Sequence, residues 1–268
     1  MAEVTKLVDV TRCVGCRGCV VACKEWYDLP GEWQGARFEG SYQHAGGSLG
    51  YNRWVNVQFY EVARDDGQPP TWFFRKHQCL HCGEPPCVAV CPVDALERTE
   101  SGAVNLDQDV CIGCRYCESA CPFGVPKYSA AERKVSKCIL CYDRITNGME
   151  PICVKTCPTG ALVFGEREQV LAEAKARLEA VRDEFPDAQI YDPPGVGGTR
   201  VVYLLPGPPE AYGLPANPRV PASVTVWQSV TKPVGGVAVG ASLAASVVAF
   251  VIQRRMNGSG DDGKRNEV

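Results

Sequence analysis

Histidine, a residue that many catalytic centres need, is scarce in this chain of 268 residues. Its only histidines are His44, His77 and His81, and no pterin or flavin motif is visible. A self-contained enzyme would need such a site or an iron with an open coordination position. The formal net charge is −3, with 28 Lys and Arg against 31 Asp and Glu, so nothing indicates nucleic-acid binding.

Cysteine is the abundant exception, and all 16 cysteines fall into four quartets. The third quartet reads C-x2-C-x2-C-x3-C-P, the bacterial ferredoxin pattern for [4Fe–4S] clusters. The second has two extra residues, the first has Lys24 where the proline stands, and the fourth has a gap of 11 residues between its second and third thiols. The quartets, in chain order, are Cys13, Cys16, Cys19 and Cys23; Cys79, Cys82, Cys87 and Cys91; Cys111, Cys114, Cys117 and Cys121; and Cys138, Cys141, Cys153 and Cys157.

Zinc and disulfide bonds are the alternative uses of these thiols. Disulfide frameworks belong mostly to short secreted chains, and zinc ribbons use two C-x2-C pairs. Neither explains third and fourth thiols at x2 and x3 spacing followed by proline. Iron and acid-labile sulfide analysis separates the cases, with about four irons per quartet against one zinc or none. We therefore predict four [4Fe–4S] clusters.

The quartets are expected to work in pairs, because the fourth thiolate of a ferredoxin run reaches the neighbouring cluster. A strand is predicted before the first quartet (Lys6–Val10) and another after the fourth (Ala161–Phe164), while a short hairpin joins the second and third. The outer strands can then close one ribbon, which favours nested pairing. Sequential pairing, the alternative, leaves the hairpin between Cys91 and Cys111 without a purpose.

Nested pairing predicts four ligand sets, named here clusters A to D. They are Cys13, Cys16, Cys19 and Cys157 for A; Cys138, Cys141, Cys153 and Cys23 for B; Cys79, Cys82, Cys87 and Cys121 for C; and Cys111, Cys114, Cys117 and Cys91 for D. When every iron carries cysteine no substrate site is open, so a row of clusters conducts electrons.

Four further polar residues stand close to these ligands in the sequence. His77 and His81 flank Cys79, and each either tunes a cluster, gates protons or simply packs. Lys137 and Lys155 neighbour ligands of cluster B and either compensate cluster charge or lie in solvent.

The remaining segments carry weaker signals. Residues 31–50 are expected to form an irregular loop, followed by a strand within Tyr51–Ala63. The segment 166–185 predicts an amphipathic helix on the core, with an apolar face formed by Val170, Leu171, Ala174 and Leu178. Residues 192–221, with a strand over 199–205, are predicted to be an extended arm along a neighbour.

A run without charge, Val234–Ile252, is 19 residues long, close to the roughly 20 that span a bilayer. It contains a GxxxG pattern at Gly236 and Gly240, with Ala244 one turn further. A buried core helix is the alternative, but such a helix seldom ends in Gln-Arg-Arg and a polar tail. Candidate interface anchors flank the run at Trp227, Lys232, Arg254 and Arg255.

The charges after this run, which continue to Lys264 and Arg265, predict a cytoplasmic tail and a cluster-bearing body on the periplasmic or outer side. The N-terminus MAEVTKLVDVTRC shows neither a signal sequence nor a twin arginine. Export would therefore require a partner that carries the signal.

Together these patterns predict an α+β fold with two ferredoxin-like [4Fe–4S]2 domains, insertions and one C-terminal transmembrane helix. The predicted parts are 1–24 with 122–165 as one cluster domain, 25–78 as an insertion, 79–121 as the other cluster domain, 166–229 as helix and arm, 230–255 as anchor and 256–268 as polar tail.

Four stretches, CIGCRYCESACPFGVPKY, EPICVKTCPTGALVFG, YDPPGVGGTRVVYLL and YGLPANPRV before the terminal helix, resemble the β subunit of respiratory, membrane-bound formate dehydrogenases. The resemblance covers nearly the whole chain. The cysteine pattern alone is shared with electron-transfer subunits of other molybdenum and tungsten oxidoreductases. Nitrate reductase β subunits differ by a tryptophan at one ligand position, and dimethyl sulfoxide reductase β subunits lack the membrane tail.

This resemblance implies a catalytic α subunit that oxidises formate, or reduces CO2, at a molybdenum or tungsten pterin cofactor, and that carries a twin-arginine signal. It also implies a membrane cytochrome b γ subunit that reduces quinone. Clusters A and B would face the α subunit, and clusters C and D the membrane. The alternative within the class is the same relay serving another pterin enzyme, such as an oxoanion reductase.

Overall fold

Two strands from opposite ends of the chain lie side by side at the centre of the fold. β1 (Val4–Asp9) pairs in parallel with β10 (Val201–Leu205). β8 (Leu162–Glu166) pairs antiparallel with the other edge of β1, and β9 (Gln189–Tyr191) completes the sheet in the order β8-β1-β10-β9. Every residue of β10 is buried, which fits an apolar run covered on both faces.

The computed structural model describes residues 2–31, 47–63 and 70–258. It divides the chain into two compact units, Met1–Pro221, called the body below, and Ala222–Val268. Most of the predicted loop 31–50, His44 and most of the polar tail lie outside the described residues. The finer division of the body into two cluster domains stays a prediction.

One face of the central sheet is covered by α6 (Arg167–Val181). Leu7, Val202 and Leu204 of the sheet pack against Val170 and Ala174 of this helix. The predicted apolar face is confirmed, since its other two members, Leu171 and Leu178, also pack on this cluster.

Side chains on the opposite face of the sheet point toward the part of the body that holds the cysteines. Side chains alternate along a strand, so Val8 and Tyr203 point to this side and join an apolar cluster with Phe73. Phe73 belongs to β3 (Thr71–His77), which pairs antiparallel with β2 (Asn56–Val62). The same alternation directs Lys6 of β1 to this face.

The prediction of an extended arm over residues 192–221 is wrong for its centre, because β10 is a buried inner strand of the sheet. The turn before β10, which contains the 3-10 helix Pro194–Val196, is hydrogen-bonded to the segment that carries the second quartet. The backbone N–H groups of Gly83 and Glu84 donate to the carbonyls of Gly198 and Val196, each at 2.8 Å. This segment therefore supports the second quartet.

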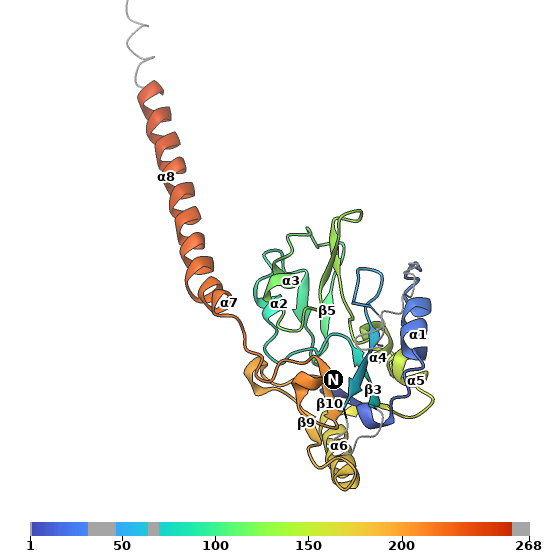
Figure 1. The fold of residues 1–268 in the computed structure, drawn as a ribbon. Helices are drawn as coiled ribbons and strands as arrows, with labels where there is room; N and C mark the ends of the chain where they lie inside the picture. The colour runs from blue at the N-terminus through green and yellow to red at the C-terminus, as the bar shows by residue number, and fades with distance from the viewer. Residues whose placement is uncertain (1, 32–46, 64–69, 259–268) are drawn as a thin grey trace, which may run out of the picture. The chain divides into compact units, whose positions relative to one another are not determined.

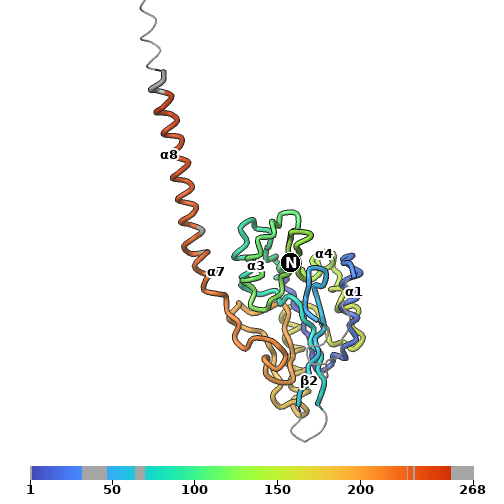
Figure 2. Tube along the Cα trace, turned by 45° about the horizontal axis from the view of Figure 1, so that its top comes forward, coloured from blue at the N-terminus to red at the C-terminus, as the bar shows by residue number. Residues whose placement is uncertain are grey.

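Short helices carry one or more thiols of each quartet. They are α1 (Gly18–Trp26), α2 (Pro86–Ala89), α3 (Tyr116–Ala120) and α5 (Ile152–Lys155). α1 packs against α5 and α2 against α3. Figures 1 and 2 place α3 on the opposite side of the body from α1. The helices of the first and fourth quartets thus meet, as do those of the second and third.

The two strand pairings that nested pairing requires are present. β1 before the first quartet pairs with β8 after the fourth, and the predicted hairpin is formed by β4 (Leu96–Arg98) and β5 (Val104–Leu106). A further hairpin, β6 (Lys127–Ser129) with β7 (Lys134–Ser136), follows the third quartet. Three more short helices are described in the body, namely the 3-10 helix Val10–Arg12, α4 (Tyr142–Ile145) and the 3-10 helix Pro209–Tyr212.

Gly113 in the third quartet should tolerate no side chain. Its φ is +69°, and an added Cβ would lie 2.1 Å from the carbonyl oxygen of Arg133. We expect Gly113→Ala to lower the free energy of unfolding by at least about 2 kcal/mol, from left-handed strain and a backbone clash together. The measurement is denaturant unfolding of the iron-loaded chain.

Gly124 supplies the matched control, because its φ is +60° but nothing lies within 4 Å of an added Cβ. Gly124→Ala should therefore show backbone strain alone, about 1 kcal/mol. Equal losses in the two variants would contradict the close approach at Gly113.

The second unit is helical over its described length, through α7 (Ala222–Val226), the π-helical segment Trp227–Thr231 and α8 (Lys232–Gly258). The span Ala222–Arg254 has a mean hydropathy of 2.1 in its most apolar window, of which 0% is buried. It is long and apolar enough to cross a bilayer. A buried soluble core helix, the alternative, does not fit these exposed apolar side chains.

Candidate metal centres

The four thiols of each predicted ligand set surround one cavity of the body. None of these four cavities is lined by thiols of two different sets. The structure therefore brings together every sequence-predicted ligand with the partners that nested pairing assigns to it.

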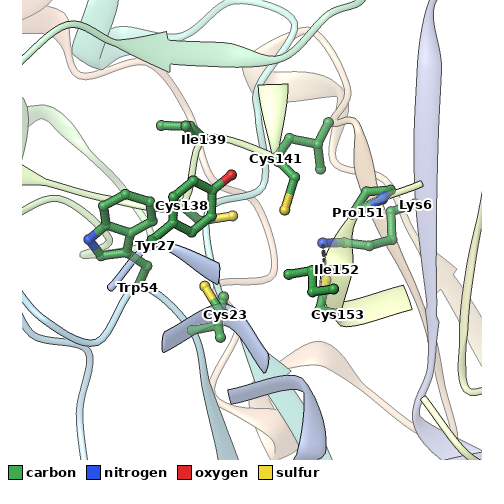
Figure 3. Close-up of a pocket in the computed structure, with 12 residues that line it drawn as sticks. Lys6, Cys23, Tyr27, Trp54, Cys138, Ile139, Cys141, Pro151, Ile152 and Cys153 are labelled. Carbon is green, nitrogen blue, oxygen red and sulfur yellow. Dashed lines mark hydrogen bonds between the residues drawn. The ribbon is translucent and has the colours of Figure 1, made fainter. Parts of the chain in front are cut away.

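The cavity of set B lies between elements from both ends of the body (Figure 3). Cys23 comes from α1 and Cys153 from α5, while Cys138 and Cys141 come from the loop before α4. Tyr27 and Trp54 form an aromatic wall, with their ring centroids 4.7 Å apart. Such a lining excludes water from the thiols.

The cavity of set A lies beside that of set B. Cys19 and Cys23 are on the same helix, α1, but they line different cavities. The same holds across α5, where Cys153 belongs to set B and Cys157, just past the helix, to set A. Each quartet thus shares its thiols between two cavities, which is the arrangement that the crossed ligation of ferredoxin runs would require.

Set C lies on the other side of set B. Cys79 and Cys121 of set C share an apolar cluster with Cys23 and Cys138 of set B. Cys87 of set C shares another cluster with thiols of set D, namely Cys91, Cys111 and Cys117. The four cavities are therefore ordered A, B, C, D through the body.

The two ends of this row reach the surface. Cys16 of set A and Cys114 of set D are exposed, whereas the four thiols of set B are buried. The neighbouring apolar side chains Val14 and Ile112 are 59% and 61% exposed. Two protein surfaces, one at each end, are thus open to partners.

The donor chemistry fits a group larger than a single ion. Over residues 2–31, 47–63 and 70–258, no three or more His, Cys, Asp or Glu side chains are placed to hold one metal ion. Each of the four cavities is nevertheless lined by four thiols, which lie too far apart to hold one ion between them. This geometry disfavours zinc, which needs its four ligands at about 2.3 Å, and fits a [4Fe–4S] core.

The thiols would not ionise readily by themselves. Burial raises the pKa of Cys19 and of Cys79 to about 11, and that of Cys117 to about 12, with nearby thiolates adding to the effect. Burial also opposes ionisation of Cys153, but the ammonium groups of Lys6 and Lys76 outweigh it and lower the pKa of this thiol. Bound iron would supply the missing positive charge.

Of the roles considered for His77 and His81, simple packing against the body fits both. His81 is fully buried, and its Nδ1 accepts a hydrogen bond of 2.9 Å from the backbone N–H of Val104. Burial lowers the pKa of His77 to about 4 and that of His81 well below its usual range, so both are neutral near pH 7. The two lysines that neighbour cluster ligands in the sequence differ in exposure. Lys137 is 2% exposed, whereas Lys155 lies in solvent.

Sequence reasoning missed a group of buried polar residues between the cavities. Lys6, Lys76 and Gln78 are each at most 1% exposed. A signal for Lys6 was available, because it occupies the same face of the predicted strand as Val8. Nothing comparable marks Lys76 or Gln78, since their burial depends on β3 lying between the sheet and the cavities.

Comparison with known families supports [4Fe–4S] clusters as the cofactor class. Residues 12–95 and 70–167 each match a family described as "4Fe-4S dicluster domain". Residues 220–260 match a family described as "Formate dehydrogenase N, transmembrane". The helix from Ala222 onward therefore corresponds to a known membrane anchor.

Similar proteins cover almost the whole chain. The formate dehydrogenase iron-sulfur subunit of Haemophilus influenzae is 41% identical over 254 residues, which is 93% of this chain and 80% of the relative. The formate dehydrogenase-O iron-sulfur subunit of Escherichia coli is 40% identical, with 93% and 83% covered. A probable anaerobic dimethyl sulfoxide reductase chain of Escherichia coli is also 40% identical, but over only 65% of this chain.

Proposed function

Because this chain belongs to the family of formate dehydrogenase iron-sulfur subunits, it is an electron-transfer subunit of a formate dehydrogenase complex, and we propose how its residues perform that role. The sixteen cysteines of sets A to D would hold four [4Fe–4S] clusters. Each cluster, when bound, exchanges one electron at a potential set by charge, exposure and hydrogen bonds to sulfur.

The observation that carries this proposal is the row of four thiol-lined cavities whose ends reach the surface while its interior is buried. The protein's part is to hold the thiolates, to order the four sites and to keep water out. In the interior, Tyr27 and Trp54 shield set B, and Pro85, Pro86 and Phe123 line set C. We therefore propose that charge enters and leaves at the two exposed ends.

We further propose two protein partners, one for each end. The surface near Val14 and Cys16 would meet a catalytic α subunit that oxidises formate at a molybdenum or tungsten pterin. The surface near Ile112 and Cys114 would face a membrane cytochrome b γ subunit that reduces quinone. The exposed apolar side chains at both ends support docking there. The same relay in an oxoanion reductase is not favoured, because the relatives that cover 93% of the chain are formate dehydrogenase subunits.

The single-helix anchor attaches the chain to the membrane. We propose that the polar tail after it is cytoplasmic and that the body lies on the periplasmic or outer side. The arginines at the end of the span, Arg254 and Arg255, support this orientation.

The test is to purify the native complex in detergent, to identify its chains, and to assay formate-dependent dye and quinone reduction with nitrate and dimethyl sulfoxide as competing substrates. A large pterin-containing partner and formate-dependent activity are expected. A complex without such a partner, or one that uses only an oxoanion, would overturn the proposal.

Truncation after Pro221 should release the body from the membrane. The body and the helical unit are separate compact units, so we expect the truncated chain to move to the soluble fraction with about 16 irons still bound. Fractionation and iron analysis measure both quantities. As a control, removal of the polar residues 256–268 alone should leave the chain in the membrane. A truncated chain that stays membrane-bound in the absence of its partner subunits would contradict a single anchor.

A further inference from the structure

Two lysine ammonium groups converge inside the body on one amide oxygen. Lys6 is 0% exposed and donates to Oε1 of Gln78 at 2.8 Å, and Lys76, 1% exposed, donates to the same oxygen. Within the described part of the chain, neither lysine forms an ion pair with an acidic side chain. Burying two like charges together is costly unless an anion compensates them.

The groups that surround these ammonium ions are thiols of sets A and B. Nζ of Lys6 lies 3.6 Å from Sγ of Cys153, a contact visible in Figure 3. Lys6 lines the cavity of set B, and Lys76 lines that of set A. Thiols of both sets, Cys19 and Cys23 among them, lie within electrostatic range of Lys76. The two charges therefore stand at the junction of the two cavities.

The two lysines that donate to Gln78 fix the orientation of its side-chain amide. An ammonium group cannot accept a hydrogen bond, so the amide oxygen must face Lys6 and Lys76. The amide nitrogen of Gln78 is then buried, and it has no hydrogen-bond partner among the described residues. A buried unsatisfied donor needs an explanation, and sulfur of an adjacent cluster is a suitable acceptor.

We propose that Lys6, Lys76 and Gln78 form a buried cationic bridge that raises the reduction potentials of clusters A and B together. This inference rests on the proposed function, because it needs those clusters in place. A cluster bound by four thiolates becomes more negative on reduction. Nearby ammonium charge in a medium of low dielectric constant stabilises that added electron. The bridge would therefore stabilise the reduced states of clusters A and B, which form the first half of the relay.

The experiment is an EPR-monitored redox titration of the purified complex, with iron and sulfide measured in every sample. In Lys76→Met, and in Gln78→Glu, two of the four reduction steps should move together to lower potential. Gln78→Glu keeps an acceptor oxygen between the two lysines, cancels one positive charge and removes the amide donor toward sulfur, and the last two of these changes both fit a shift to lower potential. Lys76→Arg keeps the charge and should leave all four steps in place.

Two lysines serve as matched controls. Lys137 is also buried, but it lies in electrostatic range of Cys79, Cys87 and Cys121 of set C. Lys137→Met should therefore shift a different step. Lys155 is exposed beside the same quartet as Cys153, and Lys155→Met should shift none.

The outcomes separate the bridge from the proposed function. Wild-type protein without iron and sulfide would overturn the function itself. Full iron and sulfide in Gln78→Glu with four unchanged steps would overturn the bridge alone. If Lys76→Met loses iron and Lys76→Arg retains it, the need for charge at this place is supported. If Lys76→Arg behaves like Lys76→Met, the charge is not what matters and the bridge is wrong.

Discussion

Cys141→Ala should interrupt the relay without stopping formate oxidation. Cys141 is buried and lines only the cavity of set B, inside the row. We expect iron to fall from about 16 per chain to about 15 when one iron leaves, or to about 12 when the cluster is lost. Formate-dependent quinone reduction should fall at least about 100-fold, because even changes behind a metal ligand cost about 10–100-fold.

Dye reduction at the catalytic subunit is the internal reference for this variant, and it should stay unchanged. No cysteine of the chain stands outside the quartets, so a neutral cysteine control does not exist. Thr156→Ala serves as the control instead. Thr156 is exposed next to the ligand Cys157, and its hydroxyl donates to the carbonyl of Ile152 in the same helix. Cys141→Ala with unchanged iron and unchanged quinone reduction would show that set B is not a ligand set.

Removal of the iron should unfold the body. Lys6, Lys76 and Lys137 are buried, and in the described part of the chain none of them pairs with a carboxylate. Breaking a buried ion pair costs about 3–5 kcal/mol, and a typical domain has only about 5–15 kcal/mol of stability. Two or three such charges without their anions are therefore enough to unfold it.

The measurement is thermal unfolding followed by near-ultraviolet circular dichroism, before and after chelation of iron from the detergent-solubilised chain. The iron-free body should lose its cooperative transition, and iron with sulfide should restore it. A sample treated with chelator under conditions that leave the iron bound is the control. An iron-free chain that unfolds cooperatively at the original temperature would contradict this expectation.

Local patterns were enough to predict the class of cofactor and the membrane anchor. Ligand spacing within a quartet is a property of a few consecutive residues, so it can be recognised without any knowledge of the fold. The uncharged run Val234–Ile252 is likewise a matter of length and composition. The two strand pairings that nested pairing requires, β1 with β8 and β4 with β5, were also within reach, because a strand beside each quartet leaves few ways to close the ribbons.

Only the tertiary structure decided how the rest of the body is arranged. The parallel pairing of β1 with β10 joins residues almost 200 positions apart, such as Lys6 and Val201, and no local pattern specifies such a contact. It turns the predicted arm into a central strand. The same packing buries Lys6 and Lys76 against one amide, because their side chains come from different strands. Charge placed between the clusters is thus a product of strand pairing, which depends on hydrogen bonding and burial across the whole body.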